Sequence, residues 1–191
     1  MDPIVGRGKY TYKVNEEWQR VPEWLELKPA ALSVDSEDRV YCFNRNDAHP
    51  VVIFDRDGNF VASWGEPGTA PGQFNLPHGV WIDRRGRVLV ADRENDRVQV
   101  FDQQGKLLNI WPVELIGPAF FYVDDDDIVY IPEHNGGMIS ILTLDGERMA
   151  RWGDPIHRSC HGIWCDSRRD LYVVQPGDWG RIRRIVKYTR Q

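Results

Sequence analysis

Two histidines of this chain stand in the same short sequence context, and their side-chain type suits metal binding. His78 lies in LPHGV and His161 in CHGIW, so each comes directly before a glycine and the start of an apolar strand. Neutral imidazoles that converge bind divalent metals, and catalytic zinc usually has three protein ligands. We expect a divalent metal, most readily zinc, at His78 and His161. Glu133, His134 and Cys160 are alternatives for a third ligand, and no spacing rule selects among them.

The same two histidines have a purely structural interpretation. A histidine at the start of a strand can cap that strand or bond a neighbouring backbone carbonyl. Since two ligands fall short of the usual zinc count, this interpretation stays open at the level of the sequence.

Arginines form the second group of candidate site residues. Arg45 lies in FNRND and Arg93 in ADREN, in the loops after second strands, and Glu133 and Gln175 fall near the same place in two further repeats. A pocket-facing arginine can hold a carboxylate by two parallel hydrogen bonds. We therefore predict catalytic roles for Arg45 and Arg93 and substrate-binding roles for Glu133 and Gln175. The alternative is an ion pair within the loop, for example from Arg93 to Asp92 or Asp96.

A fourfold repeat positions these residues. Each unit has an apolar strand that ends in aspartate, then a polar turn and further short strands. The first-strand aspartates recur about 40 residues apart, a period typical of β-propeller blades, and they are Asp35, Asp83, Asp124 and Asp166. Glycines after short polar turns, such as Gly58 and Gly146, mark tight hairpins between third and fourth strands. The chain is therefore predicted to be all-β, a propeller with four four-stranded blades.

The repeat also sets the predicted domain organisation. We expect one propeller domain over residues 1–191, and its blades span about 28–65, 74–112, 115–153 and 158–191. The fourth unit lacks an outer strand. Residues 9–15 alternate aromatic or apolar with polar side chains, so we predict that this N-terminal strand pairs with the last blade and closes the ring. A loose N-terminal arm is the alternative.

Composition excludes several classes of function. The 191 residues carry a net charge of −5, with 41% hydrophobic and 28% charged residues, so a nucleic-acid partner is not expected. We find neither an apolar stretch long enough to span a membrane nor an apolar signal core, which predicts a cytoplasmic protein without a membrane partner. The three cysteines are expected to be reduced. Trp64, Trp111 and Trp152 recur at the end of fourth strands and are predicted to pack blades together.

Two phrases carry a resemblance to a known family. PHGVWID at 77–83 and VADRENDRVQVFD at 90–102 resemble the NHL family of β-propellers. Within that family the chain is similar to the branch of peptidyl-α-hydroxyglycine α-amidating lyases. The resemblance implies a six-bladed ring with an axial zinc, three histidine ligands, two arginines and a tyrosine. It maps the zinc histidines onto His78 and His161 and the arginines onto Arg45 and Arg93.

The chain also departs from this pattern. We find no third first-strand histidine and no segment that supplies the tyrosine, as if two middle blades were missing. Two functions remain from the sequence. The first is a lyase-like enzyme with a divalent metal at the channel mouth, acting on a small carboxylate- or amide-bearing substrate. The second is a non-catalytic NHL propeller that binds a protein, a peptide or a small ligand. A third possibility is a shortened relative of a six-bladed enzyme that has lost activity and regains a complete ring by association with a second copy.

Overall fold

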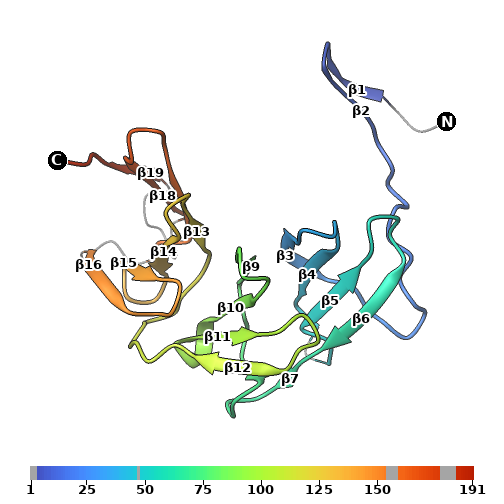
Figure 1. Ribbon diagram of the computed structural model, residues 1–191, viewed down its shortest axis with the longest axis horizontal. Helices are drawn as coiled ribbons and strands as arrows, with labels where there is room; N and C mark the ends of the chain where they lie inside the picture. The colour runs from blue at the N-terminus through green and yellow to red at the C-terminus, as the bar shows by residue number, and fades with distance from the viewer. Residues whose placement is uncertain (1–3, 47, 154–158, 177–183) are drawn as a thin grey trace.

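Four antiparallel sheets follow one another along an arc in the computed structural model, which describes residues 4–46, 48–153, 159–176 and 184–191 (Figure 1). We refer to the sheets as blades 1 to 4 in chain order. Blades 1 and 2 consist of β3 (Pro29–Val34), β4 (Val40–Asn44), β5 (Val51–Phe54) and β6 (Phe60–Trp64), then β9 (Gly79–Ile82), β10 (Val88–Asp92), β11 (Arg97–Phe101) and β12 (Leu107–Ile110). Blades 3 and 4 consist of β13 (Tyr122–Val123), β14 (Ile128–Glu133), β15 (Met138–Thr143) and β16 (Arg148–Gly153), then β17 (Gly162–Cys165), β18 (Leu171–Gln175) and β19 (Arg184–Tyr188). The predicted all-β, four-bladed propeller arrangement is confirmed.

The repeated aspartate caps the turn between the first two strands of every blade. In blade 2, Asp83 Oδ1 accepts hydrogen bonds from the backbone N–H groups of Arg85 and Arg87, both at 2.9 Å. The same pattern of two N–H donors recurs in the other blades at Asp35, Asp124 and Asp166. An aspartate that bonds its own turn fixes the turn conformation, which explains why this residue carries the period of the sequence.

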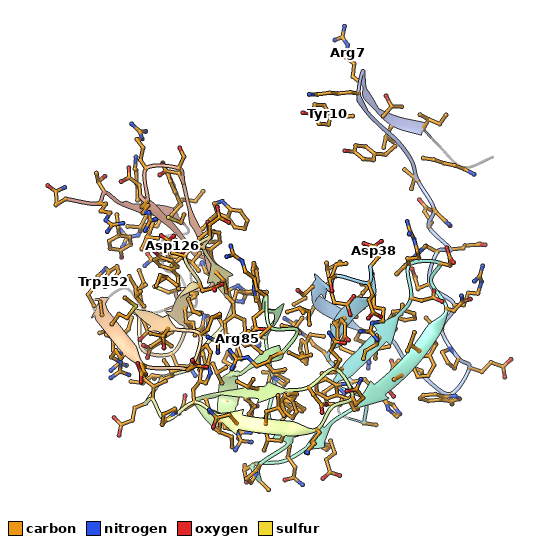
Figure 2. The ribbon with its side chains drawn as sticks, in the orientation of Figure 1. Arg7, Tyr10, Asp38, Arg85, Asp126 and Trp152 are labelled. Atoms are coloured by element: carbon orange, nitrogen blue, oxygen red, sulfur yellow. The ribbon has the colours of Figure 1, made fainter. Side chains whose placement is uncertain are left out.

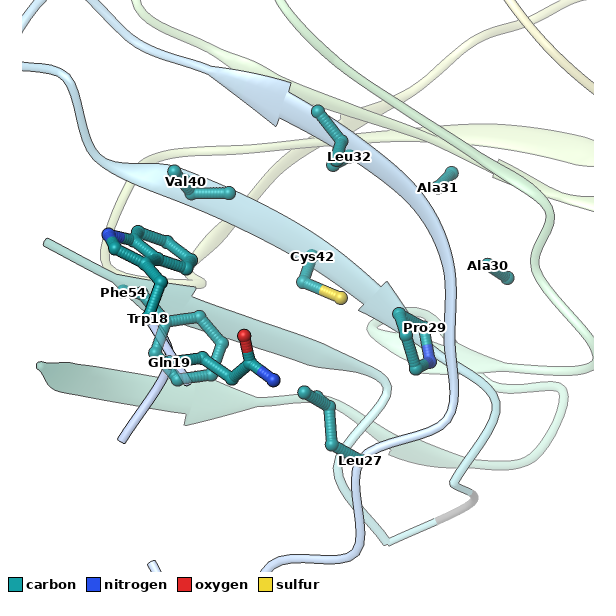
Figure 3. Close-up of a pocket in the computed structure, with 10 residues that line it drawn as sticks. All are labelled: Trp18, Gln19, Leu27, Pro29, Ala30, Ala31, Leu32, Val40, Cys42 and Phe54. Atoms are coloured by element: carbon teal, nitrogen blue, oxygen red, sulfur yellow. The ribbon is translucent and has the colours of Figure 1, made fainter. Parts of the chain in front are cut away.

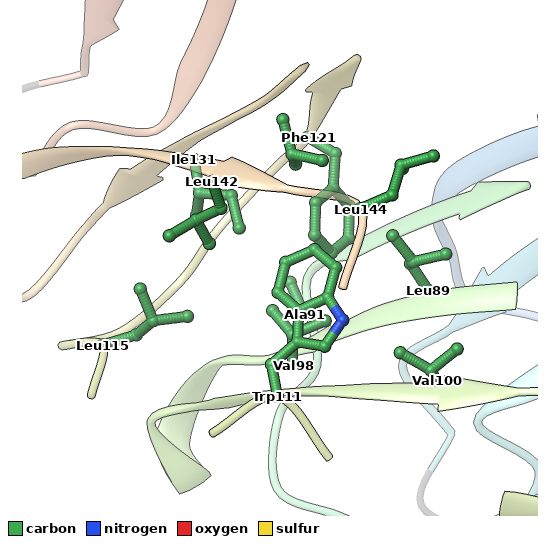
Figure 4. Packing of buried hydrophobic residues seen from close by; sticks show 11 residues of the cluster. Leu89, Ala91, Val98, Val100, Trp111, Leu115, Phe121, Ile131, Leu142 and Leu144 are labelled. Carbon is green, nitrogen blue, oxygen red and sulfur yellow. The ribbon is translucent and has the colours of Figure 1, made fainter. Parts of the chain in front are cut away.

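Apolar clusters between neighbouring blades form the core. Figure 4 shows the cluster between blades 2 and 3, where Trp111 lies among side chains such as Leu89, Phe121 and Leu142. A similar cluster joins blades 1 and 2, and a third joins blades 3 and 4. Each blade therefore buries its faces against its neighbours, as expected for a repeat that cannot form a core alone.

The N-terminal strand does not close the ring, so this part of the prediction is wrong. β2 (Tyr10–Lys13) pairs with β1 (Ile4–Arg7) in a separate two-stranded sheet. In the part of the chain that the structure describes, blade 4 has three strands, and β19 pairs with β18. Figure 2 shows Arg7 and Tyr10 on this hairpin, well away from the four blades. The alternating pattern of residues 9–15 fits any antiparallel partner, and a two-residue turn at 8–9 brings the nearest partner, β1, within reach.

The outer face of blade 1 is partly covered by the segment that precedes it. Leu25 is buried against Cys42, Val52 and Phe54, and Trp18 packs beside them. Between this segment and the sheet lies a hollow of about 480 Å³, lined by side chains that include Leu27, Leu32 and Val40 (Figure 3). The hollow is mostly apolar, and none of the predicted site residues lines it.

Two short parallel strands, β7 (Glu66–Pro67) and β8 (Gln73–Phe74), join blades 1 and 2, and a single 3-10 turn, η1 (Arg93–Asn95), follows β10. All three cysteines are buried, and none of them forms a disulfide bond. Among the residues described, there is no helix with the length and apolar character needed to cross a bilayer.

Candidate functional site at the channel mouth

His78 and His161 occupy equivalent positions at the starts of first strands. The His78 N–H donates to the carbonyl of Ala91 at 2.9 Å, and the His161 N–H donates to the carbonyl of Val174 at 2.9 Å. In blade 3 the equivalent bond runs from Ala119 to Pro132 at 3.0 Å. Blade 3 therefore offers no imidazole at this position, in agreement with the sequence.

The two imidazoles meet, although they come from blades 2 and 4. Their ring centroids are 5.5 Å apart in an edge-to-face arrangement, and Phe120 of blade 3 contacts the His161 ring at 4.9 Å. Gly79 makes this approach possible, because a Cβ at that position would lie 2.6 Å from the Ala119 carbonyl oxygen. A side chain there would push blade 2 away from blade 3 and separate the two histidines.

His78 is engaged at both ring nitrogens. Its Nδ1 lies 3.0 Å from the Leu76 carbonyl oxygen, and its Nε2 lies 2.7 Å from Nη1 of Arg93. The carbonyl requires a proton on Nδ1, so Nε2 accepts the hydrogen bond from the guanidinium and the ring is neutral. Burial lowers the pKa of His78 to about 4, and the charges of Arg93, His161 and Arg45 lower it further while the Leu76 bond opposes them.

Both predicted arginines belong to this cluster. Arg93 joins His78 directly, and its Nε donates to the Glu94 carboxylate at 2.7 Å. The side chain of Arg93 is 15% exposed, so it can be reached from the mouth. Arg45 is exposed, and it is close enough to His78 to affect the pKa of that ring. The alternative of an ion pair within the loop is thus met by Glu94. Asp92, the partner named as an example, pairs with Arg97 at 2.8 Å instead.

Glu133 has a structural role that sequence reasoning missed. Its carboxylate is fully buried and accepts hydrogen bonds from the Ile116 N–H at 2.7 Å, the Ser140 hydroxyl at 2.7 Å and Arg151 at 2.6 and 2.9 Å. Each carboxylate oxygen of Glu133 thus accepts two hydrogen bonds. Glu133 therefore anchors the end of β14, and we assign it no contact with a substrate.

Gln175 has the same kind of role in blade 4. Its side chain is buried, and its Oε1 accepts a hydrogen bond from Arg184 Nε at 2.8 Å. The structure thus gives both predicted substrate-binding residues partners within their own blades.

The strand ends show why the prediction for Glu133 was misplaced. The second strands end at buried polar residues that anchor the following loop, and these are Asn44, Asp92, Glu133 and Gln175. The next residues along the chain are Arg45, Arg93, His134 and Pro176. The first three of them lie near His78 or His161. The equivalent of the two arginines in blade 3 is therefore His134.

His134 does join the cluster. Its ring lies 5.6 Å from that of His161 between centroids, again edge to face. His161 is thus the central member, in contact with His78 of blade 2 and with His134 and Phe120 of blade 3. A small pocket of about 20 Å³ is lined by Arg45, Leu76 and Pro77, the last two next to His78 in the sequence.

The donor chemistry of this cluster suits a divalent metal, because neutral imidazole is a good ligand for zinc. In the described ranges, however, no three His, Cys, Asp or Glu side chains are already arranged as a ligand set. The Nε2 atom of His78 faces the Arg93 guanidinium. A metal at His78 would therefore require Arg93 to move.

The structure defines a β-propeller whose candidate site residues gather around His161, and comparison with known proteins gives its repeat type. Residues 74–101, which hold His78 and Arg93, match the NHL repeat model. The chain therefore contains one matched NHL repeat within a β-propeller fold, which supports the resemblance. NHL repeat-containing protein 3 of Mus musculus is 41% identical over 120 residues, which cover 60% of this chain and 35% of that protein. This chain thus spans about a third of that relative.

Two further comparisons concern proteins with enzymatic names. Peptidylglycine alpha-amidating monooxygenase of Rattus norvegicus is 38% identical over 90 residues, which cover 44% of this chain and 9% of that protein. The structure of a catalytically inactive virginiamycin B lyase from Staphylococcus aureus with quinupristin superposes with a TM-score of 0.65 at 15% identity, over 94% of this chain and 59% of that chain. At this identity the second likeness concerns the fold alone.

Proposed function

We propose that the chain is a lyase-like enzyme that binds a small carboxylate- or amide-bearing substrate at the channel mouth, next to a divalent metal. One observation carries the proposal: His78 contacts the Arg93 guanidinium on one side and the His161 imidazole on the other. An anion-binding group and potential metal ligands thus meet at one point, on strands and loops that the propeller holds in place. The identity with the amidating monooxygenase supports the same reading.

Arg45 and Arg93 would bind the substrate carboxylate. A guanidinium offers paired N–H donors that match the two oxygens of a carboxylate. Arg93 now uses Nη1 on a neutral imidazole, and a charged carboxylate is a stronger acceptor than that ring. Substrate binding would therefore draw Arg93 away from His78 and leave Nε2 of His78 facing the mouth. The low pKa of His78 keeps this nitrogen unprotonated at neutral pH.

The imidazoles around His161 would hold the metal, with His78 and His161 as the pair expected from the sequence. When bound there, a divalent metal supplies Lewis-acid polarisation or lowers the pKa of a coordinated hydroxyl. The proposed reaction is elimination from a carbinolamide carbon. The bond from that carbon to the amide nitrogen breaks, the hydroxyl proton ends on the nitrogen, and the products are a primary amide and an aldehyde acid. Arg45 and Arg93 would retain the acid product through its carboxylate.

Glyoxylate release from an N-acyl-α-hydroxyglycine tests this proposal. We expect turnover by the zinc-loaded chain, loss of turnover after chelation, and a decrease of about tenfold or more in Arg93→Lys, because lysine cannot form the paired contact. Arg84→Lys is the matched control, since Arg84 is exposed in a turn and pairs with Asp125. A zinc-loaded chain that binds the compound without releasing glyoxylate would overturn the lyase.

The second candidate is a non-catalytic module that binds the carboxylate of a peptide or small molecule. It is favoured by the lack of a preformed three-ligand metal group among the described residues. In that case Arg45, Arg93 and the imidazoles would bind the ligand without metal. Binding of an N-acyl-glycine that is unaffected by a chelator and weakened by Arg93→Lys would identify this function.

A further inference from the structure

Blades 1 and 4 lie at the two ends of the arc (Figure 1), and each end carries a sheet face that is buried elsewhere in the repeat. On blade 2, the cross-strand pair Ala91 and Val98 is fully buried against blade 3. The equivalent pair on blade 4 is Val174 and Ile185, and both are exposed, Ile185 to 70%. Among the described residues, this face of blade 4 is therefore an inter-blade face that no further blade covers.

The opposite end of the arc shows the complementary situation. Blade 2 buries Val80 against blade 1. The residue of blade 1 at the same place before the turn aspartate is Leu32, which lines the hollow and is 68% exposed. The hollow thus lies where the apolar face of a preceding blade would pack.

Trp18 already occupies one part of the place of that preceding blade. Between blades 1 and 2, the ring of Trp64 packs on Phe101 at 4.9 Å between centroids. Trp18 packs in the same way on Phe54 at 5.8 Å, and a Cβ at the turn glycine Gly58 would lie 1.9 Å from its carbonyl oxygen. Trp18 therefore stands where the fourth strand of a preceding blade would end. The other three strands are what blade 4 has in the described ranges, as β17–β19.

We propose that blade 4 of one copy of this chain packs on blade 1 of a second copy, next to Trp18, in a head-to-tail contact. This contact continues the series of inter-blade contacts within the chain. Because each copy has one face of each kind, the contact is heterologous, so it either closes into a ring of copies or extends to further copies.

Charges at the rim of the two faces fit the same register. Between blades 2 and 3, Arg85 in the turn after the first strand pairs with Asp145 in the hairpin turn at 2.8 Å. The equivalent residues at the two ends of the arc are Arg168 of blade 4 and Asp57 of blade 1, and both are exposed. Opposite charges would therefore meet at this place in the contact between two copies.

Mixing two blocked variants tests the head-to-tail contact. Ile185→Lys puts a charge on the face of blade 4, and Leu32→Lys puts one on the face of blade 1. Both side chains are exposed, so the fold should tolerate either change. We expect each variant alone to be monomeric in gel filtration with light scattering. Their mixture retains one intact face of each kind and should form a two-chain species. Leu108→Lys, at an exposed leucine of blade 2, is the matched control and should associate like wild type.

Charge reversal tests the register with substitutions on the rim. Arg168→Asp places like charges opposite each other, so it should weaken association by about threefold or more. Adding Asp57→Arg to the same chain exchanges the two charges and should restore association. A double variant that associates no better than the single variant would contradict this register.

Three other results would overturn the proposal. Wild type that stays monomeric at every concentration excludes the contact. Normal association of Leu32→Lys combined with loss in Ile185→Lys would mean that blade 4 pairs with blade 4 of the second copy. A mixture of the two blocked variants that stays monomeric would show that the two faces do not bind each other.

Discussion

Trp111 at the end of blade 2 lies directly against Gly146 in the hairpin turn of blade 3. A Cβ at Gly146 would fall well inside contact distance of the Trp111 ring. The same relationship joins the preceding pair of blades, where a Cβ at Gly105 would lie 2.5 Å from Trp64. In each of these turns a glycine, which has no side chain, lies against the tryptophan of the preceding blade. The predicted packing role of these two tryptophans is therefore a contact with a turn glycine of the next blade.

Gly146→Ala should destabilise the protein strongly. The φ of Gly146 is +84°, and the added methyl would overlap Trp111, so we expect a loss of about 2–4 kcal/mol from overpacking and backbone strain. Gly72→Ala is a matched control, because Gly72 has the same φ of +84° with nothing within 4 Å of the added Cβ. The difference between the two variants in urea denaturation isolates the contact with Trp111. Equal losses would show that this contact contributes nothing.

Glu133→Gln should destabilise the fold, because Glu133 anchors its blade. The substitution removes the charge opposite Arg151 and turns an amide N–H₂ toward groups that are themselves donors. We expect a loss of about 2–3 kcal/mol. Glu147→Gln on the exposed surface of the same blade should be neutral. Unchanged stability of Glu133→Gln combined with weaker ligand binding would instead restore the substrate-binding role first expected for Glu133.

His78 should make the protein less stable in mild acid. The pKa of His78 is lowered to about 4 in the folded chain by burial, whereas an unfolded histidine has a pKa of about 6.5. Between these values the unfolded state binds a proton that the folded state does not, so the His78 contribution is fully present above pH 6.5 and falls as the pH drops toward 4. The free energy of unfolding of wild type and His78→Gln, measured from pH 7.5 to 4.5, tests this contribution. The free energy of unfolding of the variant should change less with pH than that of wild type. Identical slopes would contradict the assigned protonation state.

The outer face of blade 4 should support self-association. Trp164, Val174 and Ile185 share this face and are 62%, 44% and 70% exposed. Apolar groups exposed side by side mark association surfaces, and a second copy offers the exposed Leu32 and Val34 of blade 1. Light scattering after gel filtration should show mass rising with concentration, and Ile185→Lys should abolish the rise. A monomer at every concentration would rule this out.

The fold was predictable because its signals are local and repeat. A turn aspartate such as Asp83 and a turn glycine such as Gly146 each determine the conformation of a turn only a few residues long. Their regular spacing is therefore visible in the sequence. The convergence of His78, His161 and Arg93 also followed from the repeat. The sheet that Tyr10–Lys13 would join was not predictable, because an alternating strand does not specify its partner.

The sequence offers His134 as one alternative for a third ligand, but it does not show that His134 is equivalent to Arg45 and Arg93. The anchors at the ends of the second strands differ in type, from Asn44 to Asp92 to Glu133, so the sequence does not show that they are equivalent. When the equivalence of the anchors is not known, the sequence repeat aligns Glu133 with the two arginines. His134, the true equivalent, then falls one residue after the aligned position. Only the burial of the anchors shows which of the two residues faces the mouth.

The anchors at the strand ends separate two tasks within adjacent residues. Asn44, Asp92, Glu133 and Gln175 hold the loops through contacts inside each blade. The residue that follows, whether arginine, histidine or proline, contributes nothing to those contacts. Side-chain changes at these following positions should therefore cost less folding free energy than changes at the anchors. A propeller of this kind can evolve new binding residues one blade at a time. In protein engineering, the residues at positions 45, 93, 134 and 176 could be substituted independently of one another.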